Sequence, residues 1–347
     1  MAIEARIVNR GLANILAFFS DPDGLAPRPK TRALEKLNWD RLIRAASRQY
    51  TLAIVQHNIT ENPIGITVPS SVLREIESRL ARFQLKTAFH RDALVEALSE
   101  FSRRRQKVVV LKGPALAERY YPEPWLRLFS DIDLMVPRSV IPEVQDTLHY
   151  LGYEPQDPDK ERLCLEEYGE LTLTRRYDPV PIKLELHWDF VNSRSLRSVA
   201  GVRARDFWGR AAPTSILGVP AFELAPEDSV FGLVLHLAYN HQFHRLLSLV
   251  DICQILRRCG DEFDWDRLVN LAQKRNLKLA FSTTFRLAHG LFGLSIPGEV
   301  RPYFAPTRLY SKVAEHLLGK QLLGSPSRPR GSLRRKLYRE VLKREGR

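Results

Sequence analysis

Two aspartates that lie two residues apart have the types and spacing best suited to chemistry in this sequence. Asp131 and Asp133 belong to the segment SDIDLMV (130–136), whose composition predicts a β-strand. Side chains two apart in a strand point to the same face of the sheet. Two ionised carboxylates about 6 Å apart repel each other by roughly 3 kcal/mol at an effective dielectric of 20, which favours a cation beside them. Because the motif has neither Cys nor His, its oxygen ligands favour Mg²⁺ or Mn²⁺ over zinc.

A second predicted strand, IKLELHW (182–188), supplies a third carboxylate, Glu185. Alternation puts Lys183, Glu185 and His187 on one face of this strand. Three carboxylates on adjacent strands can hold two metal ions about 3.5 to 4 Å apart, which suits phosphoryl transfer. Two alternatives remain for Glu185 and His187. Glu185 pairs with Lys183 or Arg175 on the sheet surface, and His187 either faces the same cleft or forms a structural hydrogen bond to Asp189 or to backbone.

Phosphate-binding candidates lie upstream of the aspartates. Lys112 and Gly113 end the predicted strand 107–112 and lead into a predicted helix at 114–121, and backbone N–H groups at such a junction favour a phosphate. Lys112 as a point charge and Arg127 as a fork are candidates for contacts to a triphosphate. A solvated lysine at a strand end is the alternative for Lys112.

The elements that must position these residues indicate an α+β fold with four parts. Helical periodicity predicts an N-terminal helical region at 1–105, with helices near 39–46 and 72–83. A small mixed sheet follows at 106–200, with strands at 107–112, 131–136, 171–175 and 182–188 and a helix at 140–150. Helical spacing then returns in a region at 201–320, with helices from about 230, 265 and 277. A basic tail at 321–347 ends the chain.

The predicted helix from 230 carries a polar stripe. At 100° per residue His236, Asn240, His244 and Asp251 fall on one side of a continuous helix. We interpret His236, Asn240 and His244 as the lining of a lid across a nucleotide cleft. A zinc site and histidines that pack through hydrogen bonds are the alternatives.

Composition and charge exclude several classes of protein. In 347 residues, 44% are hydrophobic and 27% are charged, which excludes wholesale disorder. Three cysteines with no CxxC pair exclude a disulfide framework and a four-cysteine zinc site and favour a reducing, cytoplasmic setting. No apolar run reaches the roughly 18 residues of a spanning helix.

The net charge of +13 is concentrated near the end of the chain. From residue 320 onward ten basic residues face only Glu340 and Glu345. Leu333, Leu337 and Val341 fall four apart among these basic residues, so we predict a basic amphipathic helix. Such a tail is either a solvated end or a contact to an anionic partner, a membrane surface or RNA.

These motifs together resemble a known family. The order of LKGPALAERYYPEPWLR (111–127), SDIDLMV, LELHW (184–188) and LVLHLAYNHQFHRLLSLVDI (233–252) is similar to the polymerase-β-like nucleotidyltransferase superfamily, and more closely to an uncharacterised bacterial nucleotidyltransferase family, over roughly 39–280. The resemblance implies that Asp131 and Asp133 bind two metal ions with a nucleoside triphosphate, in a motif that begins at Ser130. It also implies that Glu185 completes the metal site toward the acceptor hydroxyl.

The resemblance predicts a metal-dependent enzyme. It would move a nucleoside monophosphate from a Mg²⁺-bound triphosphate, ATP or another, to a hydroxyl of a sugar, peptide, metabolite or RNA, and release pyrophosphate. One departure concerns Gly113-Pro114, where the superfamily commonly has Gly-Gly or Gly-Ser, because proline has no N–H to offer a phosphate. The alternative is therefore a non-catalytic nucleotide- or RNA-binding regulatory or scaffold protein on the same fold.

Overall fold

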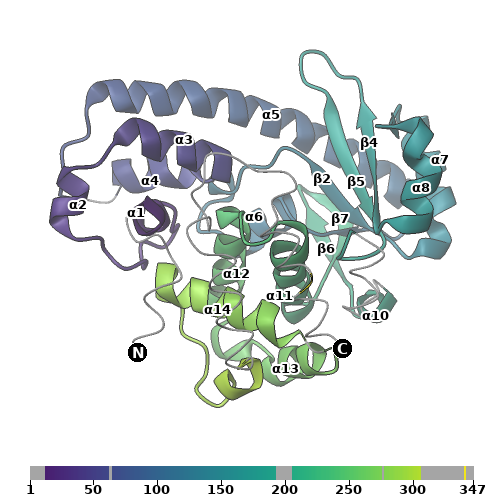
Figure 1. The fold of residues 1–347 in the computed structure, drawn as a ribbon. Helices are drawn as coiled ribbons and strands as arrows, with labels where there is room; N and C mark the ends of the chain where they lie inside the picture. The colour runs from purple at the N-terminus through teal and green to yellow at the C-terminus, as the bar shows by residue number, and fades with distance from the viewer. Residues whose placement is uncertain (1–11, 62–64, 193–204, 276, 306–339, 341–347) are drawn as a thin grey trace. The chain divides into compact units, whose positions relative to one another are not determined.

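The computed structural model describes residues 12–61, 65–192, 205–275, 277–305 and 340 (Figure 1). The chain divides into two compact units. One unit comprises 1–80 and 230–347 and is called here the helical unit. The other comprises 81–229 and is called the sheet unit. Helix α5, Ser70–Arg103, runs from the first unit into the second, and helix α11, Pro226–Leu235, runs back.

The described part of the helical unit is built from helices and the turns and loops that join them. The helix predicted near 39–46 is present, with Asn38 Oδ1 accepting a hydrogen bond from the Arg41 N–H as a cap and with Leu42, Ile43 and Ala46 buried. Helices also begin close to the predicted residues 265 and 277. The elements are α1 (Leu12–Phe19), α2 (Thr31–Glu35), α3 (Trp39–Gln49), α4 (Leu52–Glu61), a π-helical turn (His236–Asn240), α12 (Leu246–Cys259), α13 (Trp265–Gln273), α14 (Lys278–Phe292) and 3₁₀ turns at Gly260–Glu262 and Arg301–Phe304.

The sheet unit contains a mixed sheet whose seven strands are arranged in the order β3-β4-β5-β2-β1-β7-β6. The pairs β2–β5 and β1–β7 are parallel, and the remaining neighbours are antiparallel. Together with the helices this confirms the predicted α+β fold. The strands are β1 (Val109–Val110), β2 (Ile132–Met135), β3 (Glu154–Pro155), β4 (Glu170–Arg175), β5 (Ile182–His187), β6 (Ala212–Ile216) and β7 (Val219–Glu223).

Helices of the sheet unit follow the predicted positions at 114–121 and 140–150. Proline begins or nearly begins three of them, which is where its missing N–H costs least. The helices are α6 (Pro114–Tyr120), α7 (Ile141–Tyr150), α8 (Pro158–Glu167) and α10 (Arg205–Trp208), with 3₁₀ turns at Pro124–Leu126 and Arg138–Val140.

One face of the sheet is packed into a hydrophobic core. Helices α5 and α7 bury alternate residues of β2, β4 and β5 on this face, and Figure 1 shows α7 beside the β4–β5 hairpin. Alternation then sends the intervening residues of the same strands to the opposite face, which is where Asp133 and Glu185 lie. The core includes Leu94, Leu98, Phe101, Ile132, Leu134, Val144, Leu148, Leu171, Leu173, Leu184 and Leu186.

The hairpin β6–β7 was not predicted, because the sequence indicated a helical region from 201 onward. Pro213 and Pro220 lie within these strands, and proline weakens a strand prediction. Leu217 and Gly218 turn the chain with φ of 53° and 79°, and positive φ at both central residues suits a tight hairpin. The hairpin pairs with β1 through β7, so the sheet extends well beyond residue 200.

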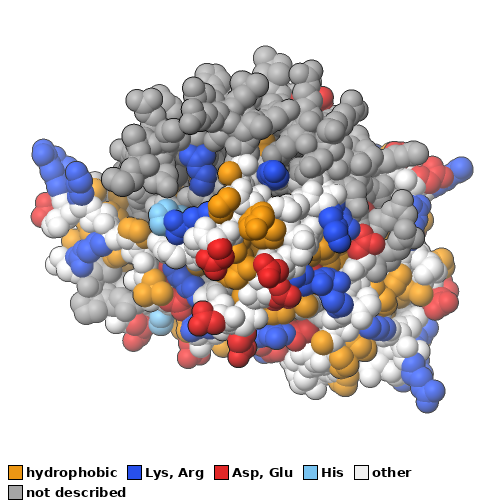
Figure 2. Space-filling model, turned by 90° about the horizontal axis from the view of Figure 1, so that it is seen from below, with side chains coloured by type: hydrophobic (Ala, Val, Ile, Leu, Met, Phe, Trp, Pro, Cys, Tyr) orange, Lys and Arg blue, Asp and Glu red, His pale blue; other side chains and the backbone are white. Residues whose placement is uncertain are grey.

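Figure 2 shows Asp and Glu side chains interspersed with Lys and Arg on the face that it draws. The predicted basic amphipathic helix of the tail lies outside the described residues. Among the helices that the structure describes, none combines the length and the apolar character needed to cross a bilayer.

Candidate active site

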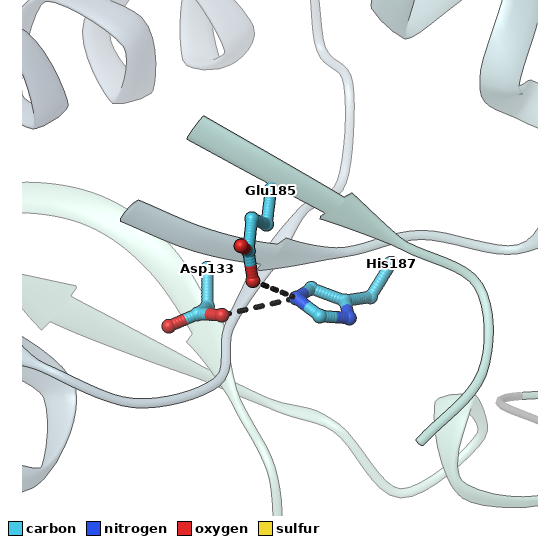
Figure 3. A group of neighbouring side chains, drawn as sticks. All are labelled: Asp133, Glu185 and His187. Atoms are coloured by element: carbon cyan, nitrogen blue, oxygen red, sulfur yellow. Dashed lines mark hydrogen bonds and ion pairs between the residues drawn. The ribbon is translucent and has the colours of Figure 1, made fainter. Parts of the chain in front are cut away.

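The register between β2 and β5 brings the predicted carboxylates together. These strands are parallel neighbours in which Asp133 is the partner of Glu185, and Met135 is the partner of His187. Leu134 faces the core from β2, so Asp133 faces the other way, and the same alternation applies to Glu185 and His187 on β5. Figure 3 shows Asp133, Glu185 and His187 pointing toward one another.

His187 lies between the two carboxylates. Its Nε2 atom is 3.0 Å from Asp133 Oδ1 and 3.6 Å from Glu185 Oε2. The ligating atoms of these three residues all lie within 4.8 Å of one another. His187 is only 3% exposed and Asp133 only 7%, so these polar groups meet largely shielded from water.

Two lysines complete the positive side of the cluster. Lys112 Nζ lies 3.0 Å from Asp133 Oδ1, and the Lys183 ammonium pairs with the Glu185 carboxylate. The Lys112 side chain is 18% exposed, so it is a paired lysine rather than a solvated strand end. The pairing of Glu185 with Lys183, one of the two alternatives from the sequence, is present together with the approach of Glu185 to Asp133. Arg175 pairs instead with Glu96.

Glu170 on β4 is a member of the cluster that the sequence analysis missed. It is the register partner of His187, and its Oε2 atom lies 3.4 Å from His187 Nδ1. Asn192 Nδ2 donates to Glu170 Oε1 at 2.5 Å. The predicted strand began at Leu171. A strand longer by one residue would have included Glu170, which shares a face with Thr172.

Asp131 lies directly before β2, within the electrostatic reach of this cluster. Burial raises the pKa of the Asp131 carboxyl, and the negative charges of Asp133 and Glu185 raise it further against the attraction of Lys112. Burial likewise raises the pKa of Glu170, with repulsion from Glu185 adding to it and the attraction of His187 opposing it. These two acids are therefore harder to ionise than ordinary carboxyl groups.

The pKa values of Asp133, Glu185 and His187 are shifted so that the charged form of each group is favoured. Burial opposes the charge of Asp133, but Lys112 and His187 hold the pKa of Asp133 well below its usual value. Burial and repulsion from Asp133 also oppose the charge of Glu185, yet its ion pairs with His187 and Lys183 bring its pKa to about 2. Burial would lower the pKa of His187, but its hydrogen bond to Asp133 and its ion pair with Glu185 raise it to about 10. pKa shifts in opposite directions within one buried cluster are typical of functional sites.

The donor atoms of the cluster fit a divalent cation. Two ligands about 2.1 Å from one octahedral ion are roughly 3 Å apart when adjacent and about 4.2 Å apart when opposite. The separations of His187 Nε2 from Asp133 and Glu185, 3.0 and 3.6 Å, fall in this range. Asp133, Glu185 and His187 would thus hold one ion, with Asp131 one residue before the strand. The involvement of Asp131 and the number of ions remain predictions.

Of the predicted phosphate-binding residues, Lys112 belongs to the cluster, whereas Gly113 and Arg127 have other contacts. Gly113 has a φ of 59°, and a Cβ there would meet the Phe129 ring at 3.3 Å, which accounts for glycine. The Arg127 guanidinium is buried and donates from Nη1 to the Leu128 carbonyl at 3.0 Å. Ser130 directly precedes Asp131 and is half-buried. The roles of these residues toward a nucleotide remain predictions.

Arg127 also lines a small pocket of the sheet unit. The pocket has a volume of about 170 Å³, and apolar side chains form much of its wall. Its lining comprises Gln84, Thr87, Ala88, Arg91, Pro114, Ala117, Glu118, Pro124, Trp125, Arg127, Leu128, Phe129 and Leu217.

The continuous polar stripe predicted for His236, Asn240 and His244 is wrong. Helix α11 ends at Leu235, the π-helical turn carries His236 and Asn240, and the chain then turns at Gln242 and Phe243 with φ of 49° and 58°. His244 lies beyond this turn, and Asp251 belongs to α12, which starts at Leu246. The periodicity failed because a π turn and two left-handed residues break the 3.6-residue repeat.

Within this segment two histidines are paired. His236 Nε2 lies 2.8 Å from His241 Nε2, and the ring centroids are 4.4 Å apart. In the described part of the chain, the group of three or more metal-ligating side chains that converges is the Asp133 cluster rather than this segment. The role of His236, Asn240 and His244 toward a nucleotide stays a prediction.

Fold and site together define an α+β protein with a buried acidic cluster suited to a divalent cation. The model of a family described as uncharacterised nucleotidyltransferases matches residues 35–293, well over half of the chain, and the chain belongs to that family. The matched range includes every residue of the cluster. The comparisons with curated proteins and with solved structures find no match.

Proposed function

We propose that this nucleotidyltransferase moves a nucleoside monophosphate from a metal-bound nucleoside triphosphate to a hydroxyl acceptor and releases pyrophosphate. The convergence of Asp133 and Glu185 from adjacent parallel strands, in a member of this family, is the observation that supports the proposal best. The acceptor oxygen bonds to the α-phosphorus while the bond from that phosphorus to the pyrophosphate oxygen breaks. Positioning and charge stabilisation carry most of such a reaction.

Each residue has a distinct task in this proposal. Asp131, Asp133 and Glu185 would hold one or two divalent cations, which supply charge neutralisation for the triphosphate and acidify the acceptor hydroxyl. Lys112, whose Nζ lies 3.0 Å from Asp133 Oδ1, would contact a phosphate as a point charge. With a pKa of about 2, Glu185 stays ionised near neutral pH and is suited to hold and orient rather than to take up a proton.

Label transfer tests the proposal. The full chain is incubated with each α-³²P-labelled triphosphate, Mg²⁺ or Mn²⁺, and either cell extract or defined hydroxyl acceptors, and the labelled product is isolated. We expect label in one class of acceptor with wild type and none with Asp133→Asn. Asp146→Asn, on the exposed side of α7, is the matched control and should keep full activity. Label on the protein itself would identify the acceptor as this chain.

Nucleotide binding without turnover is the second candidate function, and Pro114 is the observation that favours it. Proline at the first position of α6 removes one N–H from the junction after Gly113. This candidate predicts retention of labelled nucleotide with no pyrophosphate release under any acceptor condition. If the tail serves RNA, deletion of residues 325–347 should abolish a steep salt dependence of RNA binding.

A further inference from the structure

We infer that His187 is a metal ligand of this site, that Glu170 is the residue that positions it, and that the site therefore prefers a first-row transition ion such as Mn²⁺ over Mg²⁺. The inference rests on the proposed divalent-cation chemistry and adds the identity of the third ligand and the choice of ion. The sequence motif with Asp131 and Asp133 has only oxygen donors. The fold adds a nitrogen donor to it.

The first argument is the position of His187 Nε2. This atom is 3.0 Å from Asp133 Oδ1 and 3.6 Å from Glu185 Oε2, so the nitrogen and the two carboxylates converge on one point. Figure 3 shows the imidazole presenting this nitrogen to both carboxylates. The register fixes the arrangement, because His187 is two residues after Glu185 on β5 and shares its face.

The second argument is the contact on the far side of the ring. His187 Nδ1 lies 3.4 Å from Glu170 Oε2, and Glu170 is held in turn by the Asn192 amide at 2.5 Å. A metal-ligating histidine commonly donates its other ring N–H to a carboxylate, which selects the tautomer with a free lone pair on the ligating nitrogen. Asn192, Glu170 and His187 form such a chain, and it ends at Asp133 and Glu185.

The ion preference follows from the donor set. Carboxylate oxygens suit Mg²⁺ and Mn²⁺ alike, whereas an imidazole nitrogen binds first-row transition ions better than Mg²⁺. Mg²⁺ also gives up its water reluctantly. An O,O,N site built from Asp133, Glu185 and His187 should thus select Mn²⁺ when both ions are present.

Nitrogen coupling to bound Mn²⁺ tests the inference without any measurement of activity. Mn²⁺ is added to the full chain at a stoichiometry below one, and ¹⁴N modulation is recorded by pulsed electron paramagnetic resonance. We expect imidazole nitrogen coupling in wild type and its loss in His187→Gln. His149→Gln, an exposed histidine on α7, is the matched control and should retain the coupling. Absence of coupling in wild type, or its persistence in His187→Gln, would overturn the assignment.

Calorimetric titration with Mn²⁺ and Mg²⁺ separately tests selectivity and the role of Glu170. Glu170→Gln should weaken Mn²⁺ binding about tenfold, as loss of an outer partner of a ligand commonly does, and should weaken Mg²⁺ binding less. Glu154→Gln, an exposed carboxylate on the neighbouring strand β3, should change neither. Equal loss for both ions, or no loss, would refute the positioning role. Because these measurements contain no nucleotide, they can fail while label transfer succeeds, and the reverse, so the two proposals are tested independently.

Discussion

Buried carboxylates occur in both units of the molecule, but their partners differ. In the helical unit, Asp21 meets the Arg257 guanidinium in a bidentate pair at 2.6 and 3.1 Å. Asp23 accepts from Arg257 at 3.0 Å, Arg258 at 2.9 Å and Gln254 at 2.6 Å. Acids and guanidiniums are matched in number and geometry here, as in a network that joins α12 to the segment after α1.

In the sheet unit the acids outnumber their cationic partners. Four carboxyl groups surround three basic groups, and single atoms are shared, since Asp133 Oδ1 lies 3.0 Å from both Lys112 and His187. A network in which every acid has a cationic partner stabilises the fold. A cluster in which acids outnumber the basic groups still attracts a further cation. The four acids are Asp131, Asp133, Glu170 and Glu185, and the basic groups are Lys112, Lys183 and His187.

The largest effect is expected from a substitution at the centre of the acidic cluster in the sheet unit. Asp133→Asn should lower the rate of nucleotidyl transfer at least a hundredfold, about 3 kcal/mol in the barrier, because in the proposed function Asp133 is a central cation ligand. The measurement is pyrophosphate release with the acceptor found by label transfer. Thermal unfolding should show that the variant is folded, and activity within tenfold of wild type would rule out the mechanism.

A substitution in the Asp21–Arg257 network of the helical unit should instead lower the stability of the fold. Asp21 is fully buried, and Asp21→Asn leaves Arg257 partly uncompensated, so the free energy of unfolding should fall by about 3 kcal/mol. Urea denaturation followed by circular dichroism measures the loss. The exposed pair Asp40–Arg44 provides the control, because Asp40→Asn should change stability by less than about 1 kcal/mol. Similar losses in the two variants would contradict the comparison.

Asp228 is an intermediate case, a buried acid with a half-exposed guanidinium, Arg210, as partner. Burial raises the pKa of Asp228 from 3.8 to about 6, more than Arg210 lowers it. The folded state then binds this proton more tightly than the unfolded state, so the contribution of Asp228 to stability is greatest below about pH 4 and is lost as pH rises to about 6. The loss contributed by this group should be about 2 to 3 kcal/mol.

Denaturation at a series of pH values measures this slope. Asp228→Asn should flatten the part of the profile between about pH 4 and 6, while Asp266→Asn, in the first turn of α13, should leave it unchanged. A profile for Asp228→Asn that parallels wild type would show that Asp228 ionises normally in the folded protein.

The smallest effect is expected from substitution of Lys112. Lys112→Met removes a positive charge from beside Asp133 and, in the proposed function, a contact to the triphosphate. The KM for the triphosphate should rise about tenfold, equivalent to about 1.4 kcal/mol. Initial rates over a range of triphosphate concentrations give this value. Lys160→Met on α8 is the control. An unchanged KM in Lys112→Met would show that Lys112 only neutralises the charge of Asp133 and does not contact the triphosphate.

Local signals in the sequence were sufficient for much of the sheet and for its acidic residues. Alternating apolar residues located β2, β4 and β5 and put Asp133, Glu185 and His187 away from the core. The same signals failed where local geometry was unusual. Prolines obscured the β6–β7 hairpin, and a π turn with positive φ at Gln242 and Phe243 broke the helix expected through His236 and His244.

The amino-acid sequence alone determined which side of each strand is polar, because that depends only on alternation between neighbouring residues. Only the tertiary structure decided that β5 lies next to β2, with Asp133 opposite Glu185 and Glu170 opposite His187. A shift of one residue in either pairing would have sent one member of each pair to the core. Register depends on packing between segments far apart in the chain, so the nitrogen donor and its carboxylate partner became visible only in the folded sheet.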